Sequence, residues 1–139
     1  MSLPPGIYLI KNRKTGYYIV PDNGTSSGDK VKTKNIGGDV PTEAKISVSV
    51  DQSGLYTLKS DSNLSIADSG KTDLQGKRYL VWQEGDFKWS VKVASAGLWN
   101  LKLPNDPKFA ADNYSIGANV ILMDAGSASE TRWEFVNSG

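Results

Sequence analysis

The sequence predicts an all-β fold built from three similar units. One segment pattern, glycine, aliphatic, aromatic, any residue, aliphatic, lysine, occurs at 6–11, 54–59 and 97–102. This period-2 pattern is typical of a strand with one buried face. The copies start roughly 45 residues apart, which indicates an internal repeat. No stretch of the sequence has the periodicity of a helix.

Each repeat is expected to hold four strands within one domain, 1–139. The repeats are expected at 6–53, 54–96 and 97–139. Strands of the first are predicted at 6–11, 17–20, 30–34 and 44–50, with a turn at 12–16 and loops at 22–29 and 35–43. Strands of the second are predicted at 54–59, 64–67, 78–82 and 87–93, with a glycine-rich loop at 68–76. Strands of the third are predicted at 98–103, 109–111, 120–123 and 132–136.

Three copies favour a β-trefoil over a propeller, because a propeller needs at least four blades to close its ring. In a β-trefoil six strands form a short barrel, and the other six form three hairpins that cap one end. Two sets of equivalent core residues are expected: Tyr8, Tyr56 and Trp99 in the first strands, and Ile46, Trp89 and Trp133 in the fourth. Unequal side chains at equivalent places predict some departure from exact threefold symmetry.

Composition excludes several classes of function. The chain has no cysteine and no histidine, which removes disulfides, the usual zinc sites and the histidine-dependent nucleophiles. We therefore expect a protein that is not an enzyme, with no catalytic residues, cofactor or metal. A net charge of +1 without a basic cluster argues against nucleic acid as partner.

No apolar run approaches the roughly 20 residues that span a bilayer, so no membrane partner is expected. The start of the chain has neither a basic segment nor an apolar run of secretory type, which predicts a cytoplasmic protein. We expect a monomer.

The two ends of the chain carry a family resemblance. Pro5-Gly6-Ile7-Tyr8 opens the first strand almost at the N-terminus, and Trp133-Glu134-Phe135 lies near the end of a cysteine-free chain of 139 residues. In these features the whole chain resembles the small β-trefoil proteins of mushrooms, both their protease inhibitors and their ricin-B-like lectins. The resemblance implies a disulfide-free β-trefoil with a part in fungal defence.

The resemblance to serine-protease inhibitors of the mycospin type implies a reactive loop between the second and third strands. The corresponding residues here are Asp22, Asn23, Gly24 and Thr25, with Asn23 as the specificity residue. Such a loop is stiff, loses little entropy on binding and enters the active site of the enzyme. The first hypothesis is therefore an inhibitor of trypsin-like serine proteases.

The resemblance to cysteine-protease inhibitors of the mycocypin type implies two other segments. Ile36-Gly37-Gly38 is slim enough to lie across a papain-like cleft, and Asn63 corresponds to an asparagine aimed at asparaginyl endopeptidase. Basic residues on loops or loop edges are further candidates for the reactive residue of a serine-protease inhibitor, although each is better interpreted as a solvated charge: Arg13, Lys14, Lys71, Lys77, Arg78 and Lys108.

The resemblance to the lectins implies the alternative, carbohydrate binding. Those lectins carry Gln-x-Trp in their fourth strands, whereas the triplets here are 44–46, 87–89 and 131–133, none of which contains glutamine. Weak or single-site sugar binding is therefore expected. Acidic and amide residues that follow the second strands are candidates for it and are also ordinary turn residues: Asp22, Asn23, Asp68, Asp112 and Asn113.

The third strand of the first repeat carries lysines at alternate positions. Lys30, Lys32 and Lys34 share one face of 30–34, which we interpret as the solvated outer face of a strand.

Overall fold

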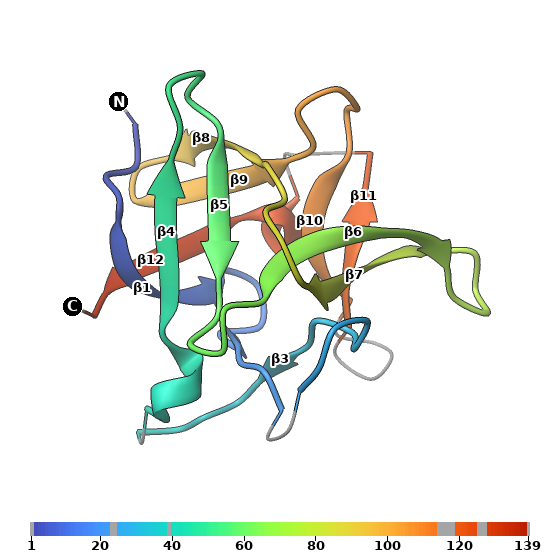
Figure 1. The fold of residues 1–139 in the computed structure, drawn as a ribbon, viewed down its shortest axis with the longest axis horizontal. Helices are drawn as coiled ribbons and strands as arrows, with labels where there is room; N and C mark the ends of the chain where they lie inside the picture. Colours follow the sequence, from blue (N-terminus) through green and yellow to red (C-terminus); the bar gives the residue numbers. More distant parts are fainter. Residues whose placement is uncertain (1, 23–24, 39, 114–118, 125–127, 139) are drawn as a thin grey trace.

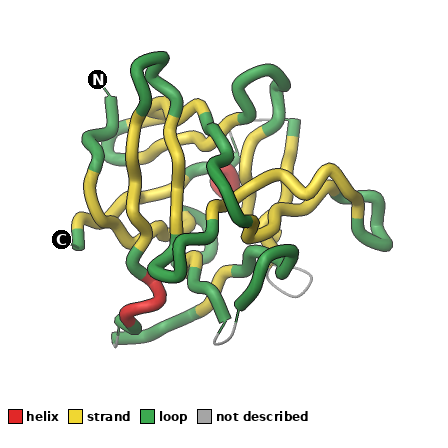
Figure 2. The backbone as a smooth tube through the Cα atoms, viewed as in Figure 1, coloured by secondary structure: helices red, strands yellow, loops and turns green. Residues whose placement is uncertain are grey.

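The computed structural model describes residues 2–22, 25–38, 40–113, 119–124 and 128–138. Within these residues the chain is all-β, as predicted, with twelve strands (Figures 1 and 2). The strands are β1 (Gly6–Asn12), β2 (Tyr18–Ile19), β3 (Thr33–Lys34), β4 (Ile46–Val50), β5 (Tyr56–Lys59), β6 (Ser65–Thr72), β7 (Arg78–Gln83), β8 (Ser90–Ser95), β9 (Leu98–Lys102), β10 (Phe109–Asn113), β11 (Asn119–Met123) and β12 (Trp133–Asn137). Short 3₁₀ turns, η1 (Thr42–Ala44) and η2 (Ser129–Thr131), precede β4 and β12. No helix of the described chain is long and apolar enough to cross a membrane.

Six strands close into a barrel. The pairing runs β1–β4, β4–β5, β8–β9, β9–β12 and β12–β1, all antiparallel. The ring is completed between β5 and the residue before β8, where Tyr56 and Trp89 exchange two backbone hydrogen bonds of 2.8 Å. A closed ring leaves no strand edge exposed in the barrel.

The other six strands form the hairpins β2–β3, β6–β7 and β10–β11. Their inner strands meet in a triangle through three single pairings: Lys30 with Val81, Tyr79 with Ile121, and Asn119 with Lys32. Each pairing joins the residue before a buried centre on one strand to the residue after it on the next. The centres are Val31, Leu80 and Val120, all almost fully buried. Barrel and triangle together are the predicted β-trefoil.

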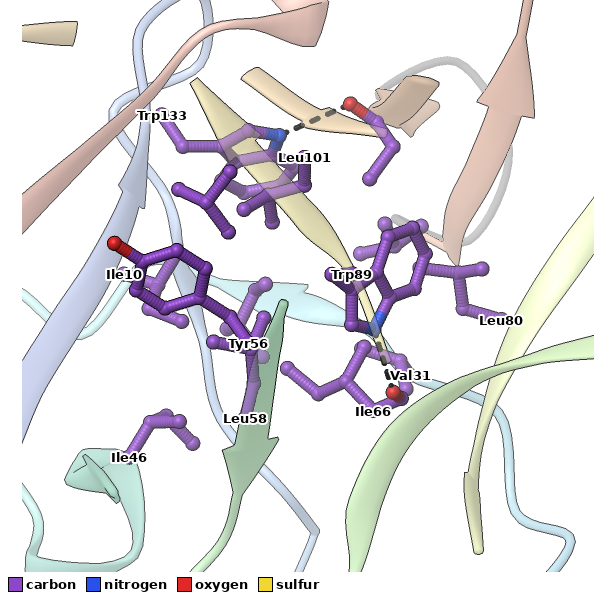
Figure 3. Packing of buried hydrophobic residues seen from close by; sticks show 14 of the residues in the cluster. Ile10, Val31, Ile46, Tyr56, Leu58, Ile66, Leu80, Trp89, Leu101 and Trp133 are labelled. Carbon is purple, nitrogen blue, oxygen red and sulfur yellow. Dashed lines mark hydrogen bonds between the residues drawn. The ribbon is translucent and has the colours of Figure 1, made fainter. Parts of the chain in front are cut away.

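The predicted equivalence of the aromatic residues is confirmed by the barrel register. Cross-strand partners are Tyr8 with Ile46, Tyr56 with Trp89, and Trp99 with Trp133. The indole of Trp89 donates to the Ile66 carbonyl at 2.8 Å, and the indole of Trp133 donates to the Ala110 carbonyl at 3.0 Å (Figure 3). The first repeat has no such donor, because Ile46 stands at the position equivalent to Trp89 and Trp133.

These residues lie in one hydrophobic core that fills the barrel (Figure 3). The largest fully buried side chains come from all three repeats and include Ile10, Ile46, Leu58, Trp82, Trp89, Leu101 and Trp133. Burial of this kind is the main favourable term in folding. Apolar side chains of the described residues therefore occupy the barrel interior.

The second hairpin corrects one prediction. Residues 68–76 were expected to form a loop, but β6 continues to Thr72 and the turn is confined to 73–77. The pairing shifts between Asp68 and Thr72, and Gly70 adopts a φ of +72°, which together mark a β-bulge. The composition of this bulge resembles that of a loop. The resulting β6–β7 hairpin projects from the molecule with Leu74 fully exposed near its tip (Figure 1).

Other strand bounds differ in smaller ways. The predicted strand at 44–50 begins at Ile46, because residues 42–44 form η1. The predicted strand at 30–34 keeps only Thr33–Lys34 as regular strand, with Lys30 and Lys32 in the single pairings of the triangle.

The repeated glycine serves two purposes. Gly54 and Gly97 have φ of +83° and +76° and end the β4–β5 and β8–β9 turns. Such a conformation strains any residue with a Cβ. Gly6 instead begins β1 in ordinary strand conformation, because the chain termini replace the third turn.

Candidate functional site

The loop after β2 holds the predicted protease-binding residues. The Thr25 amide donates to the Asp22 carbonyl at 3.0 Å, and the Thr25 hydroxyl donates to the same oxygen at 2.5 Å. Asp22 and Thr25 are thus joined by two hydrogen bonds to one carbonyl oxygen. Asn23 and Gly24 lie outside the described residues.

Asp22 and Thr25 face the β5–β6 turn across a polar hollow of about 240 Å³, which we call the acidic hollow. Its lining residues come from three separate segments: Pro21, Asp22, Thr25, Glu43, Ser60, Asp61 and Ser62. Three of them are carboxylates and three are hydroxyls, and none is basic. Its polar groups therefore mainly accept hydrogen bonds, although the hydroxyls also donate.

The β5–β6 turn is held by its own backbone. The Ser60 amide donates to the Leu64 carbonyl at 2.8 Å, and the Asn63 amide donates to the Ser60 carbonyl at 2.9 Å. The Ser60 and Ser62 hydroxyls lie 3.0 Å apart in a hydrogen bond. Asn63 has a φ of +67°, a conformation that asparagine tolerates better than most residues. The backbone conformation of the turn accounts for asparagine at position 63. The turn also places Ser60, Asp61 and Ser62 in the lining of the hollow.

Glu43 reaches the hollow from η1. The Ala44 amide donates to the Pro41 carbonyl at 3.0 Å, and the Ala44 side chain is fully buried. Burial of alanine on one side of this short turn leaves the Glu43 side chain exposed on the other. Sequence reasoning missed Glu43 and Ser60 as site residues, although both lie in predicted loops or turns.

Asp22 is paired as well as exposed. Its carboxylate forms an ion pair with the Lys34 ammonium, which lowers the pKa of Asp22 from its ordinary value. More than half of the Asp22 side chain remains accessible, at 55%. Asp22 is therefore ionised at neutral pH and keeps accessible oxygen surface.

A second hollow of about 310 Å³ shares Asp22 and Thr25 with the first. We call it the lysine hollow, because its remaining lining is Asp29, Lys30 and Lys32. Asp22 and Thr25 therefore line both hollows.

The other two predicted aspartates lie in different surroundings. Asp68 is opposite Leu80 in β6–β7, and Asp112 is opposite Val120 in β10–β11. Extending the β2–β3 register by two residues from Ile19 and Thr33 places Pro21, not Asp22, at the equivalent position. Asp22 thus lies one residue further along the chain than its counterparts.

Neither counterpart is open to a ligand. The Arg78 guanidinium binds the Asp68 carboxylate with both arms, and only 10% of the Asp68 side chain is exposed. Asp112 is 1% exposed and accepts hydrogen bonds from the hydroxyls of Thr15 at 2.7 Å and Thr33 at 2.9 Å. Of the three aspartates, Asp22 alone combines exposure with a hollow among the described residues.

The predicted cysteine-protease segment has a packing role. Ile36 is half-buried against a small cluster formed by Leu9, Val20 and Ala44. Gly37 has a φ of +60° and its amide donates to the Asn35 side chain at 3.3 Å. Gly38 follows in an exposed bend. The segment does not join the residues of the acidic hollow.

The residues at the missing glutamine positions are Ala44, Phe87 and Thr131. Ala44 and Thr131 are fully buried, and the Thr131 hydroxyl donates to the Ala128 carbonyl at 2.7 Å. In the described ranges no three acidic side chains are grouped in a way that would hold a metal ion.

The arrangement can be compared with known proteins. No protein-family model and no curated protein matches the sequence. Solved structures match it closely in fold. The Macrolepiota procera ricin B-like lectin in complex with lactose has a TM-score of 0.80 at 16% identity, with 99% of this chain and 100% of that chain covered.

The Rhizoctonia solani agglutinin has a TM-score of 0.84 at 16% identity, with 99% of each chain covered. The designed threefold-symmetric protein ThreeFoil has a TM-score of 0.80 at 19% identity, with 96% of this chain and 99% of that chain covered. At these identities the comparisons establish a shared fold.

Proposed function

We propose that this chain is a carbohydrate-binding protein that holds a sugar unit in the acidic hollow. The observation that carries the proposal is the convergence of Asp22, Glu43 and Asp61 with three hydroxyl groups around one concave spot. Carboxylate oxygens accept hydrogen bonds from neighbouring sugar hydroxyls, and hydrogen bonds to a charged acceptor are the stronger ones. Serine and threonine hydroxyls donate or accept as needed.

The similar structures support this choice. Two of the three are described as a lectin or an agglutinin, and one of these is bound to lactose. Within the described lining of the hollow no aromatic ring is available to pack against a sugar face, so we expect modest affinity, with a Kd on the order of 1 mM to 0.1 mM.

Protease inhibition through the same loop is the competing hypothesis. A substrate-like inhibitor presents an extended segment, whereas two hydrogen bonds to the Asp22 carbonyl hold Thr25 against Asp22. The carboxylates and hydroxyls grouped around these two residues suit the recognition of sugar hydroxyls. This comparison makes the sugar hypothesis the stronger one.

Screening on a glycan array, followed by calorimetric titration with the best glycan, tests the proposal. Lactose is the first soluble probe, because it is the sugar named for a similar structure. We expect Asp22→Asn and Asp61→Asn each to weaken binding about tenfold, which corresponds to about 1.4 kcal/mol. Glu134→Gln, which changes an exposed carboxylate on β12, is the matched control and should bind as the parent does.

A protease panel run on the same preparation separates the two hypotheses. It contains trypsin, chymotrypsin, subtilisin, papain and an asparaginyl endopeptidase. Stoichiometric inhibition of one of them, combined with no binding on the glycan array, would overturn carbohydrate binding in favour of the inhibitor hypothesis.

A further inference from the structure

Three lysines at alternate positions lie close to Asp22. Lys30 and Lys32 line the lysine hollow, and Lys34 forms the ion pair with Asp22. The sequence alone favours a solvated face for these lysines. In the structure two of them, Lys30 and Lys32, line a hollow that shares Asp22 and Thr25 with the proposed sugar site.

Lys30 and Lys32 keep their charges free of ion pairs. In the described chain no carboxylate lies within 4.0 Å of either ammonium, whereas Lys34 is paired. The Lys30 ammonium lies 4.9 Å from the centre of the Tyr79 ring. A ring face holds the ammonium in place without neutralising it, so its charge remains available to a ligand.

The carboxylates near these lysines are already engaged. Asp22 is paired with Lys34, and the Asp29 carboxylate accepts a hydrogen bond from the Ser26 amide at 2.9 Å. Asp73, whose charge also acts on Lys30, accepts hydrogen bonds from the Gln75 and Lys77 amides. The lining of the lysine hollow holds two carboxylates and two ammonium groups and is neutral overall, whereas the described lining of the acidic hollow has three carboxylates and no cation.

We propose that the preferred ligand is an acidic oligosaccharide, in which a neutral sugar lies in the acidic hollow and a carboxylate or sulfate on the next unit binds Lys30 and Lys32. This inference rests on the proposed function and specifies its ligand class. Two hollows that share Asp22 and Thr25 suit two linked sugar units. Only the lysine hollow has cations in its described lining, which fixes the end that receives the anion.

Titration with a matched set of probes tests the inference. The set is lactose, 3′-sialyllactose and 3′-sulfated lactose, which share the neutral disaccharide and differ in the anion. We expect both acidic probes to bind at least tenfold more tightly than lactose at 50 mM salt. The difference should shrink severalfold at 500 mM salt, because salt screens exposed charges.

Variants assign the preference to the two lysines. Lys30→Ala/Lys32→Ala should remove the preference for the acidic probes and leave lactose affinity within about twofold. Lys32→Arg should retain the preference, because the charge is kept. Lys88→Ala/Lys92→Ala changes the net charge equally on β8 and the segment before it and should behave as the parent does. Circular dichroism of each variant checks that the fold is intact.

The outcomes separate the two levels of the proposal. Equal affinity for all three probes, or a preference that survives in Lys30→Ala/Lys32→Ala, overturns the acidic-ligand inference and leaves carbohydrate binding standing. Preference for only one acidic probe supports the inference and selects carboxylate or sulfate. Absence of binding to every glycan overturns the proposed function and this inference with it.

Discussion

Asp112 is the most deeply buried carboxylate of the described chain, and its protonation should affect stability. Burial raises the pKa of Asp112, with hydrogen bonds from Thr15 and Thr33 opposing the rise. The folded chain therefore holds this proton more tightly than the unfolded chain does. Asp112 then lowers the free energy of unfolding as pH rises from about 3.9, the unfolded pKa, through the folded pKa, and the full loss persists above it.

Asp112→Asn tests this effect. The asparagine oxygen can still accept from both threonines and carries no charge. We expect the variant to be more stable than the parent at pH 7, with a difference that shrinks as pH falls towards 4. Urea unfolding of both proteins across this range measures the difference, in which the titration of all other groups cancels. A difference that stays constant or grows at low pH would contradict the assignment.

Trp133 carries a buried hydrogen bond as well as core volume. Trp133→Phe removes the indole donor to Ala110 and part of the ring. We expect a loss of about 1–3 kcal/mol in the free energy of unfolding. Trp89→Phe should cost a similar amount, because its indole makes the equivalent bond to Ile66. Chemical denaturation followed by circular dichroism measures both, and a cost below about 0.5 kcal/mol for either would refute the role given to the indole.

At the scale of elements, the β6–β7 hairpin depends on the ion pair at its base. Arg78 binds Asp68 with two arms and also approaches Asp106 at 3.6 Å. Arg78→Ala leaves the Asp68 carboxylate largely buried without its cation, and we expect a loss of roughly 1–3 kcal/mol. Arg78→Lys should recover only part, since an ammonium cannot form the two-armed contact.

Lys77→Ala is the control for this prediction, because the neighbouring lysine is exposed and should change stability by less than about 0.5 kcal/mol. Amide exchange in 69–77 should accelerate in Arg78→Ala only. If the two alanine variants unfold at the same urea concentration, the ion pair does not stabilise the hairpin.

The elements also show where sequence reasoning succeeds and fails. The register of Ile46, Trp89 and Trp133 followed from the repeat, because a short period and large apolar side chains are local signals. The β6 extension to Thr72 did not, since a bulge at Gly70 and polar residues resemble a loop in composition. A projecting hairpin exposes both faces, so the usual alternation of apolar residues is absent.

The site was predictable in part for a similar reason. Asp22 and Thr25 stand in a segment that the sequence predicts as a loop, but Ser60 and Asp61 join them only because β5–β6 packs beside that segment. The burial of Asp112 depends on Thr15 and Thr33, which are 97 and 79 residues away in the chain. Contacts between residues so far apart in the chain can be identified only once the fold is known. The sequence repeat predicted the architecture of the fold but not which side chains surround each residue.

At the scale of the whole molecule, the barrel closes between the two ends of the chain without a covalent link. β12 pairs with β1 over five residues, and the Ser138 amide donates to the Ile7 carbonyl at 2.8 Å. This junction takes the place that turns occupy at β4–β5 and β8–β9. The threefold arrangement therefore has three equivalent seams, the strand pairs β4–β5, β8–β9 and β12–β1. The first two are connected by a turn, and the third has no covalent connection.

A circular permutant tests whether the seams are interchangeable. Joining the original ends with a short glycine-serine linker and opening the chain between Gln52 and Ser53 moves the break to the β4–β5 turn. We expect the same barrel, with stability within about 1–2 kcal/mol of the parent because only loop-closure entropy is redistributed, and with unchanged glycan affinity, since the acidic hollow lies away from that turn. Near-ultraviolet circular dichroism of the buried tryptophans and urea unfolding measure the result.

Opening the chain inside β5, between Thr57 and Leu58, is the control and should prevent folding, because it cuts a barrel strand whose Leu58 is fully buried. If the permutant opened at the turn loses its tryptophan signal as the control does, the covalent β4–β5 connection is essential and the three seams are not equivalent.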